Sequence, residues 1–453
     1  MSSERSSFTG KIGFVLAAAG SAVGLGNIWR FPYLAAKYGG GIFLLVYVAL
    51  AVTFGFALMV AEIAIGRKTK LSPIGAFSSL DKRFGFVGWF AALIPVLILP
   101  YYSVIGGWVT KYFVGFVTGD ATAMASDTYF TGYIGQTFEP IAWFLLFIAL
   151  TAVIVLFGVE KGIEKVSKVM MPVLVALTIF IVIYTICTMD GALDGVLYYL
   201  TPDFSQFSVM TVVAAMGQLF YSMSLAMGIM ITFGSYMKKD ISIEKSVHQI
   251  EIFDTGIAFL AGMMIVPAVY VFSGGNAESM NKGPGLMFMT LPKIFETMPG
   301  GTVVGALFFF MVLLAALTSA ISLMETVVSI FQDKLKMGRR ISCLMVFGIC
   351  LLLGLPSALG YSIWESVTIL GMQFLDFFDF ISNNVLMPIV ALITCIFVGH
   401  FIRPKTAIED EVALSGKFRG RALYKAVIRF VAPVCILTIL VFSILEALGI
   451  ISI

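Results

Sequence analysis

The string GSAVGLGNIWRFP, residues 20–32, interrupts the first apolar segment of the chain. It holds three glycines within seven residues, which is poor material for a continuous helix. Close packing of small residues, as in a GxxxG pair, would account for Gly20 and Gly24. It would not account for Asn27 and Arg30, because an amide and a full charge are costly on a face that only packs. We therefore expect an unwound segment within a membrane helix, where protein or a cavity satisfies the backbone.

The composition of the chain around this string is that of a polytopic membrane protein. Of its 453 residues, 59% are hydrophobic and 12% are charged, whereas a soluble domain carries about 25% charged residues. About 20 apolar residues form one spanning helix, and eleven such spans can be traced. Their approximate bounds are 11–37, 42–66, 86–118, 140–157, 166–188, 208–237, 247–273, 301–333, 341–358, 365–400 and 427–450. A shorter amphipathic piece near 285–296 fits a helix in an outer loop.

The distribution of basic residues predicts the orientation in the membrane. With residues 1–10 placed in the cytoplasm, nearly all Lys and Arg side chains fall on the inner side. Those on the outer half are Arg30, Lys37, Lys111, Lys282 and Lys293. This asymmetry obeys the positive-inside rule, so the basic loops are topology signals and no nucleic-acid partner is needed to explain them. We expect a multi-pass membrane protein with a cytoplasmic N-terminus and, because eleven is odd, an extracytoplasmic C-terminus.

The sixth span carries a second interruption, in the string GQLFYSMSLAMG at residues 217–228. Its polar positions are Gln218, Ser222 and Ser224, which alone are weak evidence because a serine can bond to its own helix. Their place is more informative, since spans 1 and 6 open two successive sets of five spans. Interruptions at corresponding places in two halves indicate a transporter site near the membrane midplane. Broken-helix N-termini suit a carboxylate, and unwound carbonyl oxygens suit a hard cation such as Na⁺.

These motifs resemble those of the neurotransmitter:sodium symporter family, over the chain from Arg5 to about Phe401. The other matching strings are Gly66-Arg67, GPGLMFMTLP at 283–292, MPGG at 298–301 and LTSAIS at 317–322. The resemblance implies an all-α membrane fold of inverted five-helix repeats in which helices 1 and 6 are broken. Residues 11–188 would form the first repeat, 208–400 the second, and 427–450 an eleventh helix.

The resemblance implies two sodium sites made of oxygen ligands, as a hard cation requires. The first would use Ala22, Asn27, Ser222 and Asp254, together with the substrate carboxylate. The second would use Gly20, Val23, Ala315, Thr318 and Ser319. On bare sequence, hydroxyls bonded to a preceding carbonyl explain Thr318 and Ser319 equally well.

The resemblance also implies a pocket for an amino acid. Its lining would be Ala22, Gly24, Leu25, Gly26, Ile98, Tyr102, Tyr221, Ser222, Ser224, Met227, Ser319 and Leu323. Amine-transporting members carry Asp where this chain has Gly24, so glycine favours a substrate that brings its own carboxylate. Because the lining is mainly apolar, a charged side chain would lose much solvation there. We expect neutral, mainly hydrophobic or aromatic L-amino acids.

The resemblance further assigns gates and a chloride-site equivalent. The outer gate would be Arg30 with Asp379, and the inner gate would be Arg5, Ser235, Tyr236 and Asp333, although Arg5 and Asp333 also read as ordinary loop charges. The residues that match the chloride site of animal members are Tyr47, Gln218, Ser222 and Asp254. A carboxylate at Asp254 would supply the negative charge that chloride otherwise brings, which predicts chloride-independent transport.

Other functions remain open at this point. A proton-coupled amino-acid permease of the same fold is the main alternative, since Asp254 could titrate if it is desolvated. A substrate-gated sensor or channel finds no support, because no pore-like ring motif is present. An enzyme is not expected, because the chain has no HExxH or GxSxG motif. We expect a monomer or weak homodimer in the lipid bilayer that uses two Na⁺ ions.

Overall fold

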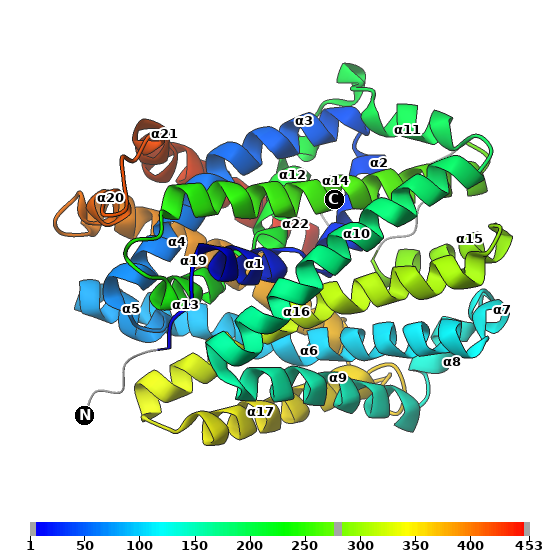
Figure 1. Ribbon diagram of the computed structural model, residues 1–453, viewed down its shortest axis with the longest axis horizontal. Helices are drawn as coiled ribbons and strands as arrows, with labels where there is room; N and C mark the ends of the chain where they lie inside the picture. The colour runs from blue at the N-terminus through cyan, green and yellow to red at the C-terminus, as the bar shows by residue number, and fades with distance from the viewer. Residues whose placement is uncertain (1–5, 276–282, 448–453) are drawn as a thin grey trace.

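The computed structural model describes residues 6–275 and 283–447, and these residues are folded almost entirely into helices (Figure 1). The first half of the chain forms α1 (Lys11–Ala22), η1 (Gly26–Arg30), α2 (Phe31–Lys37), α3 (Gly41–Leu50), η2 (Ala51–Gly55), α4 (Phe56–Thr69), α5 (Pro73–Leu80), η3 (Lys82–Phe84), α6 (Gly85–Thr118), α7 (Ala121–Met124), α8 (Tyr129–Ile134), α9 (Phe138–Leu156), η4 (Val159–Glu164), α10 (Lys165–Thr188), α11 (Ala192–Leu200) and η5 (Phe204–Gln206). The η segments are short π- or 3-10-helical turns.

The second half of the chain is also helical. Its elements are α12 (Val209–Ser222), α13 (Ile229–Tyr236), α14 (Ile243–Phe272), η7 (Leu286–Thr290), α15 (Leu291–Thr297), α16 (Gly301–Leu335), α17 (Arg339–Leu359), α18 (Phe374–Asp379), η8 (Phe380–Leu386), α19 (Met387–Ile396), η9 (Phe397–Phe401), α20 (Ala407–Ala413), α21 (Arg421–Ala426), η10 (Val427–Val431) and α22 (Ala432–Ala447). The expected outer-loop helix corresponds to η7 and α15.

The lengths and composition of these helices are those of a multi-span membrane protein. Within the described residues, nine helices are long and apolar enough to cross a membrane. A tenth candidate is the pair formed by α1 and the η1–α2 helix, which bend by 55° at their break. The expected sixth span is divided into α12 and α13, each too short to cross alone. The all-α membrane fold is confirmed, while the count of eleven spans stays a prediction.

The expected start of the tenth span, at residue 365, is wrong. The helix begins only at Phe374, because Leu370 and Gly371 both adopt left-handed backbone angles, with φ of 52° and 77°. A helix cannot pass through two such residues. The side-chain nitrogen of Gln373 donates a 2.9 Å hydrogen bond to the carbonyl of Glu365, which closes the turn before the helix.

Local backbone geometry explains the two helix breaks. After α1, Val23 is extended, with ψ of 103°. After α12, Ser224, Ala226 and Gly228 have φ of 52°, 63° and 74°. Serine and alanine seldom adopt such angles, and such strain is found mainly at functional sites. Both breaks therefore expose backbone groups in the interior of the bundle.

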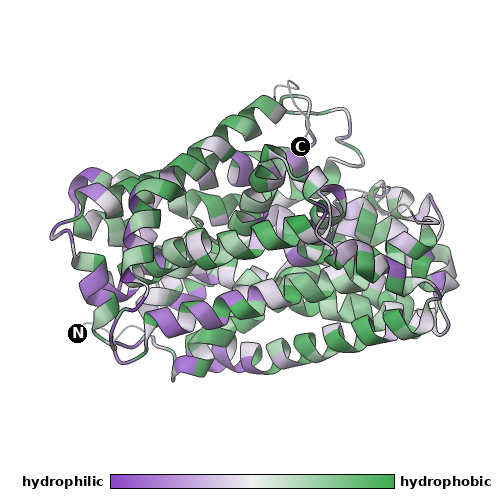
Figure 2. Cartoon of the chain, turned by 90° about the horizontal axis from the view of Figure 1, so that it is seen from above, coloured by the Kyte–Doolittle hydropathy of each residue, from purple (hydrophilic) through white to green (hydrophobic). Residues whose placement is uncertain are grey.

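The helices run along the long axis of the molecule, with α6 and α16 packed side by side near its centre (Figure 1). We call the end that carries α5, α20 and α21 the inner end, and the end that carries α7, α8 and α15 the outer end. Hydrophilic residues gather at the inner end, whereas the middle of the bundle is mainly hydrophobic (Figure 2). At Gly66 the backbones of α4 and α13 meet so closely that an added Cβ would lie 1.9 Å from the carbonyl oxygen of Ile231.

Candidate functional site

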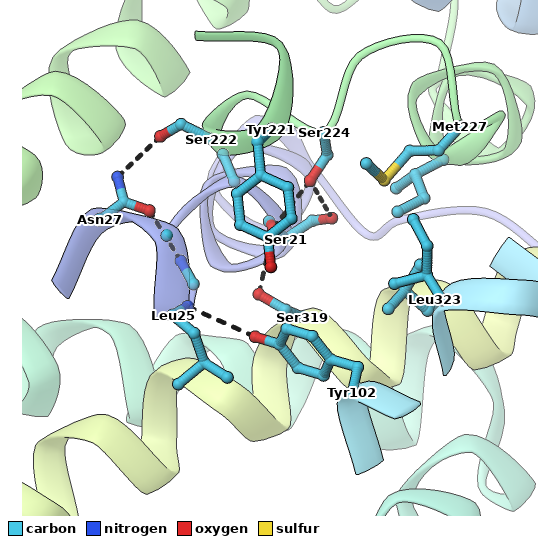
Figure 3. Close-up of a pocket in the computed structure, with 15 residues that line it drawn as sticks. Ser21, Leu25, Asn27, Tyr102, Tyr221, Ser222, Ser224, Met227, Ser319 and Leu323 are labelled. Atoms are coloured by element: carbon cyan, nitrogen blue, oxygen red, sulfur yellow. Dashed lines mark hydrogen bonds between the residues drawn. The ribbon is translucent and has the colours of Figure 1, made fainter. Parts of the chain in front are cut away.

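A small cavity lies between the two helix breaks (Figure 3). The structure brings all twelve residues of the expected substrate pocket to its wall. The residues that line it are Ser21, Ala22, Gly24, Leu25, Gly26, Asn27, Ile98, Tyr102, Tyr221, Ser222, Ser224, Met227, Ile229, Ser319 and Leu323. Ser21 and Ile229 border the cavity without having been assigned to any site from the sequence. They lie directly beside the breaks, so their position next to assigned residues could have indicated from the sequence that they line the cavity.

Two glycines of the first break leave room for the side chains around them. A Cβ on Gly24 would lie 2.9 Å from the hydroxyl oxygen of Ser319 and 3.2 Å from that of Tyr102. A Cβ on Gly26 would lie 2.4 Å from the ring of Tyr221. The two distances from a Cβ on Gly24 are short for a contact between carbon and oxygen. A larger residue in place of Gly24 would therefore have to displace Ser319 and Tyr102. The glycines thus let two tyrosines and a serine converge on one space.

One end of the cavity presents hydrogen-bond donors. The backbone N–H of Leu25 points at the hydroxyl oxygen of Tyr102, 3.5 Å away. Leu25 also precedes the first turn of η1, and the N-terminal end of a helix carries a partial positive charge. An N–H group, a phenol O–H and a helix N-terminus together form a suitable environment for a carboxylate.

A polar cluster at Asp254 joins the first break to α12, α3 and α14. The Asp254 side chain is 0% exposed. Its Oδ1 accepts hydrogen bonds from Asn27 Nδ2, at 2.8 Å, and Ser222 Oγ, at 2.6 Å. Its Oδ2 accepts one from the hydroxyl of Tyr47, at 3.2 Å. Ala22, the remaining member expected at the first sodium site, borders the adjoining cavity.

The Asp254 carboxylate has no cationic partner in the described part of the chain: no Lys, Arg or His nitrogen lies within 4.0 Å. A buried carboxylate without a counter-charge is strongly unfavourable, so the site favours a cation or a proton. Gln218 lies next to this cluster, and its Nε2 donates a 3.0 Å hydrogen bond to the carbonyl of Gly26. Of the four expected chloride-site equivalents, Tyr47 and Ser222 are therefore hydrogen-bonded to Asp254, whereas Gln218 contacts the neighbouring first break.

The residues of the expected second sodium site also meet at the first break. The Ser319 hydroxyl lies 3.4 Å from the carbonyl oxygen of Gly20 and 3.3 Å from that of Val23. The Thr318 hydroxyl instead donates to carbonyls of its own helix, at 3.1 Å to Leu314 and 3.0 Å to Ala315. The side chain of Thr318 nevertheless faces α1, because a Cβ on Gly20 would lie 3.1 Å from its Cβ.

The second break is held by contacts that the sequence did not predict. The buried Glu62 carboxylate on α4 accepts a 2.7 Å hydrogen bond from the backbone N–H of Ala226. The Ser224 hydroxyl donates a 2.9 Å hydrogen bond to the carbonyl of Ser21, which ties the two breaks together. The sequence did offer a signal for Glu62, since a carboxylate within an apolar span is rarely without a role.

A larger cavity, with about 1400 Å³ of empty space, lies on the outer side and shares Tyr221 with the inner one. Arg30 and Asp379, the expected outer gate, both border it. Asp379 accepts hydrogen bonds from the hydroxyl of Tyr101, at 2.9 Å, and from Asn383, at 2.7 Å. The Arg30 guanidinium lies 5.9 Å from the centre of the Tyr221 ring and forms no ion pair with Asp379 in the described structure.

On the inner side the pathway is closed by packed aromatic residues. The hydroxyl of Tyr236 donates a 2.8 Å hydrogen bond to Glu325, which also forms an ion pair with Arg339. Phe8 is fully buried against Tyr236 and Phe233, with ring centres 6.3 and 5.7 Å away. A hollow thus lies on the outer side of the two breaks, and aromatic side chains pack together on their inner side.

Ser235 and Asp333, two further residues of the expected inner gate, form the following hydrogen bonds. The Ser235 hydroxyl bonds to the carbonyl of Thr232 in its own helix, at 2.6 Å. Asp333 accepts a 2.6 Å hydrogen bond from the backbone N–H of Ser72 at the start of α5. Arg5 lies outside the described residues.

Comparisons with known proteins agree with this arrangement. A model of the sodium:neurotransmitter symporter family matches residues 5–133 and 131–450. The uncharacterized sodium-dependent transporter YhdH of Bacillus subtilis is 37% identical over 98% of this chain and 97% of its own length. An uncharacterized sodium-dependent transporter of Haemophilus influenzae is 33% identical over 97% of this chain and 98% of its own length.

Among solved structures, the crystal structure of MhsT in complex with L-phenylalanine is similar to this one. The two share a TM-score of 0.87 and 36% sequence identity, over 97% of this chain and 100% of that one. The family match and both relatives extend over nearly the whole chain. The chain therefore belongs to the sodium:neurotransmitter symporter family, a family of membrane transporters and not of enzymes.

Proposed function

We propose that this protein couples the inward movement of Na⁺ to the uptake of neutral, mainly hydrophobic or aromatic L-amino acids. Transport would use two Na⁺ ions, would not require chloride, and would proceed by alternating access. The observation that carries the proposal is the buried, cation-free carboxylate of Asp254 beside a cavity that offers donors for a second carboxylate. Two anionic groups so close together call for a cation between them.

Sodium fits the chemistry of both clusters. The first offers the hydroxyl of Ser222 and the carboxylate of Asp254, 2.6 Å apart. The Nδ2 of Asn27 donates to both, and its Oδ1 accepts a 3.0 Å hydrogen bond from the backbone N–H of Gly24, so Asn27 would ligate a cation only after its amide turns. The second offers the Ser319 hydroxyl and carbonyls freed by the break after α1. Hard cations prefer such oxygen ligands. Family membership, with relatives named as sodium-dependent transporters, supports the same ion.

The shape and lining of the cavity support an amino acid with an apolar side chain. The donor end at Leu25 and Tyr102 suits the carboxylate, and the apolar side chains of Met227 and Leu323 lie on the other side of the cavity (Figure 3). The apolar Ile98 also lines it. Met can adapt to side chains of different shape. MhsT, whose structure was solved with L-phenylalanine, has the same fold. Gly24 leaves no charged group to bind an amine that lacks a carboxylate.

Chloride independence follows from the charge of Asp254. Its carboxylate accepts hydrogen bonds from Tyr47 and Ser222, two of the residues that match the chloride site of animal members, so a chloride at this place would meet an anion within a few ångströms. Two like charges repel strongly in a medium of low dielectric constant. The carboxylate and chloride should therefore exclude each other.

The two cavities support an outward-facing state in an alternating-access cycle. Tyr221 separates the outer cavity from the inner one, and Arg30 lies above its ring. Closure of the outer side would bring Arg30 toward Asp379, while opening of the inner side would break the contact between Tyr236 and Glu325. Movement of this kind needs no new fold, only a shift between two packings.

Uptake of labelled L-phenylalanine into proteoliposomes tests the proposal against the proton-coupled alternative. With an inward Na⁺ gradient and equal pH, we expect accumulation, and replacing chloride by gluconate should leave it unchanged. With a pH gradient and no Na⁺, we expect none. Accumulation driven by the pH gradient alone would favour the proton-coupled permease. Competition by lysine stronger than by leucine would contradict the apolar pocket.

We also propose that the protein lies in the bacterial inner membrane with its N-terminus in the cytoplasm. It would be a monomer or a weak homodimer.

A further inference from the structure

A small basic pocket lies at the inner end of the bundle, away from both cavities of the transport pathway. It is a narrow, partly open cleft formed where η9, α20 and the start of the last span meet. Its polar lining consists of Lys405, Glu409, Tyr424, Lys425 and Arg429. The transport function does not use any of these residues. We propose that this pocket binds the phosphate group of an anionic phospholipid from the inner leaflet.

The charges of the pocket favour an anion. Its single carboxylate, Glu409, is already engaged by Lys425, at 3.1 Å, and by Arg421. Lys405 and Arg429 also line the pocket, and neither has an ion-pair partner among the residues that the structure describes. The pocket therefore keeps two cations that no protein carboxylate neutralises. Arg and Lys side chains in such a position attract phosphate groups.

A buried hydroxyl provides a second, independent observation. Tyr424 is only 3% exposed, and its hydroxyl has no hydrogen-bond partner in the described structure. Buried polar groups are almost always hydrogen-bonded, so a lone hydroxyl at the wall of a pocket indicates an acceptor from outside the chain. A phosphate oxygen between Tyr424, Lys405 and Arg429 would accept this hydrogen bond.

The surroundings of the pocket identify the acceptor as a lipid. Phe430 directly follows Arg429 in the chain and is 67% exposed, and Val434, about one turn further on, is 66% exposed. Such side chains lie in acyl chains when the span is in a membrane. The pocket lies at the end of the bundle that carries α20 and α21 (Figure 1), which the positive-inside rule assigns to the cytoplasm. A phospholipid can fill both environments at once, with its phosphate in the pocket and its chains along the last span.

The pocket is also connected to the transport helices. Glu411, two residues after Glu409 on α20, forms an ion pair with the buried Arg67 of α4, with Nε and Oε1 2.8 Å apart. Arg67 in turn donates a 2.7 Å hydrogen bond to the carbonyl of Ile241, in the loop that follows α13. A lipid that steadies α20 would thus steady the inner ends of α4 and α13.

Native mass spectrometry of the full-length protein in detergent tests the proposal, with phosphatidylglycerol and phosphatidylcholine of matched chains as probes. We expect one phosphatidylglycerol to be retained in preference to phosphatidylcholine, whose ammonium group would meet the pocket cations. Each Lys or Arg near an anionic membrane surface contributes about 1 kcal/mol, or roughly fivefold in affinity. The double variant Lys405→Gln/Arg429→Gln should therefore lose phosphatidylglycerol affinity by roughly 25-fold and should bind the two lipids alike.

The controls separate this site from general membrane electrostatics and from misfolding. Lys417→Gln removes a charge from the same loop at an exposed position that does not line the pocket, and it should bind phosphatidylglycerol as the wild type does. Tyr424→Phe should lower the affinity for phosphatidylglycerol without changing that for phosphatidylcholine. The single variant Lys405→Gln, at an exposed side chain, serves if the double variant does not fold.

Three results would overturn the proposal. One is unchanged phosphatidylglycerol binding in the double variant or in Lys405→Gln. Another is an equal loss in Lys417→Gln, which would show that only the net charge of the loop matters. The third is displacement of the lipid by millimolar inorganic phosphate, which would make the pocket a site for the free anion.

Discussion

The Asn27 side-chain nitrogen and Oδ1 of Asp254 lie 2.8 Å apart, although 227 residues separate them in the chain. This contact connects the break after α1 to α14 at a place where neither residue reaches solvent. Asn27 also lines the cavity between the two breaks, so the Asp254 carboxylate lies one side chain away from it. In the function proposed above, the pair would therefore link sodium binding, substrate binding and the replacement of chloride in one group of atoms.

Asp254→Asn should weaken sodium coupling while leaving the fold intact. Asparagine keeps an oxygen and the approximate shape but removes the charge that favours a cation. We expect the Na⁺ concentration for half-maximal uptake to rise at least about tenfold, which corresponds to about 1.4 kcal/mol. Uptake measured against Na⁺ concentration checks this, with and without chloride. Added chloride should restore part of the loss, and unchanged Na⁺ dependence in the variant would contradict the role of Asp254.

Gly24→Ala should impair uptake because the new methyl group would lie 2.9 Å from the Ser319 hydroxyl and 3.2 Å from that of Tyr102. Overpacking of this kind costs about 1–3 kcal/mol, so uptake should fall roughly five- to 100-fold. Gly348→Ala is the matched control, since a Cβ there meets no atom within 4 Å. That variant should transport normally. Equal uptake by the two variants would mean that the cavity has another shape during transport.

Arg30→Ala and Asp379→Ala should each leave the protein folded but reduce uptake by about tenfold. Both side chains border the outer cavity and form no ion pair with each other within the described structure, so their mutual role would appear only when the outer side closes. Lys37→Ala removes an outer cation that does not border this cavity and should have little effect. Thermal unfolding verifies the fold, and labelled uptake measures the loss. Wild-type uptake by both gate variants would refute the assignment.

Tyr236→Phe should make the inner side open more often, because it removes the 2.8 Å hydrogen bond to Glu325 that ties α13 to α16. A hydrogen bond to a charged group is worth about 1.5–3 kcal/mol. The test combines Tyr236→Phe with a cysteine introduced at Ser235, in a background without the native cysteines. This cysteine should be alkylated at least about tenfold faster than in the same background that keeps Tyr236. Tyr270→Phe, near the outer end of α14, is the control and should not change the rate. Equal rates in both variants would contradict an inner gate at Tyr236.

Much of the site could be predicted because its signals lie close together in the chain. The glycines around Val23 and the polar residues around Ser222 mark the breaks directly, and the residues beside them line the cavity. Glu62 was missed because its partner, the backbone N–H of Ala226, depends on how two distant segments pack. The start of the tenth span was misplaced because residues 365–373 are apolar enough to continue a helix, and only the backbone angles of the turn show otherwise.

Equilibrium binding of labelled L-phenylalanine to the purified protein in Na⁺ and in K⁺ at equal ionic strength tests sodium coupling most directly. In Na⁺ we expect saturable binding that leucine displaces and that does not change when gluconate replaces chloride. In K⁺ we expect binding to be lost, because the Asp254 carboxylate and the substrate carboxylate would then lie together without a suitable cation. Equal affinity in Na⁺ and K⁺ would contradict the account.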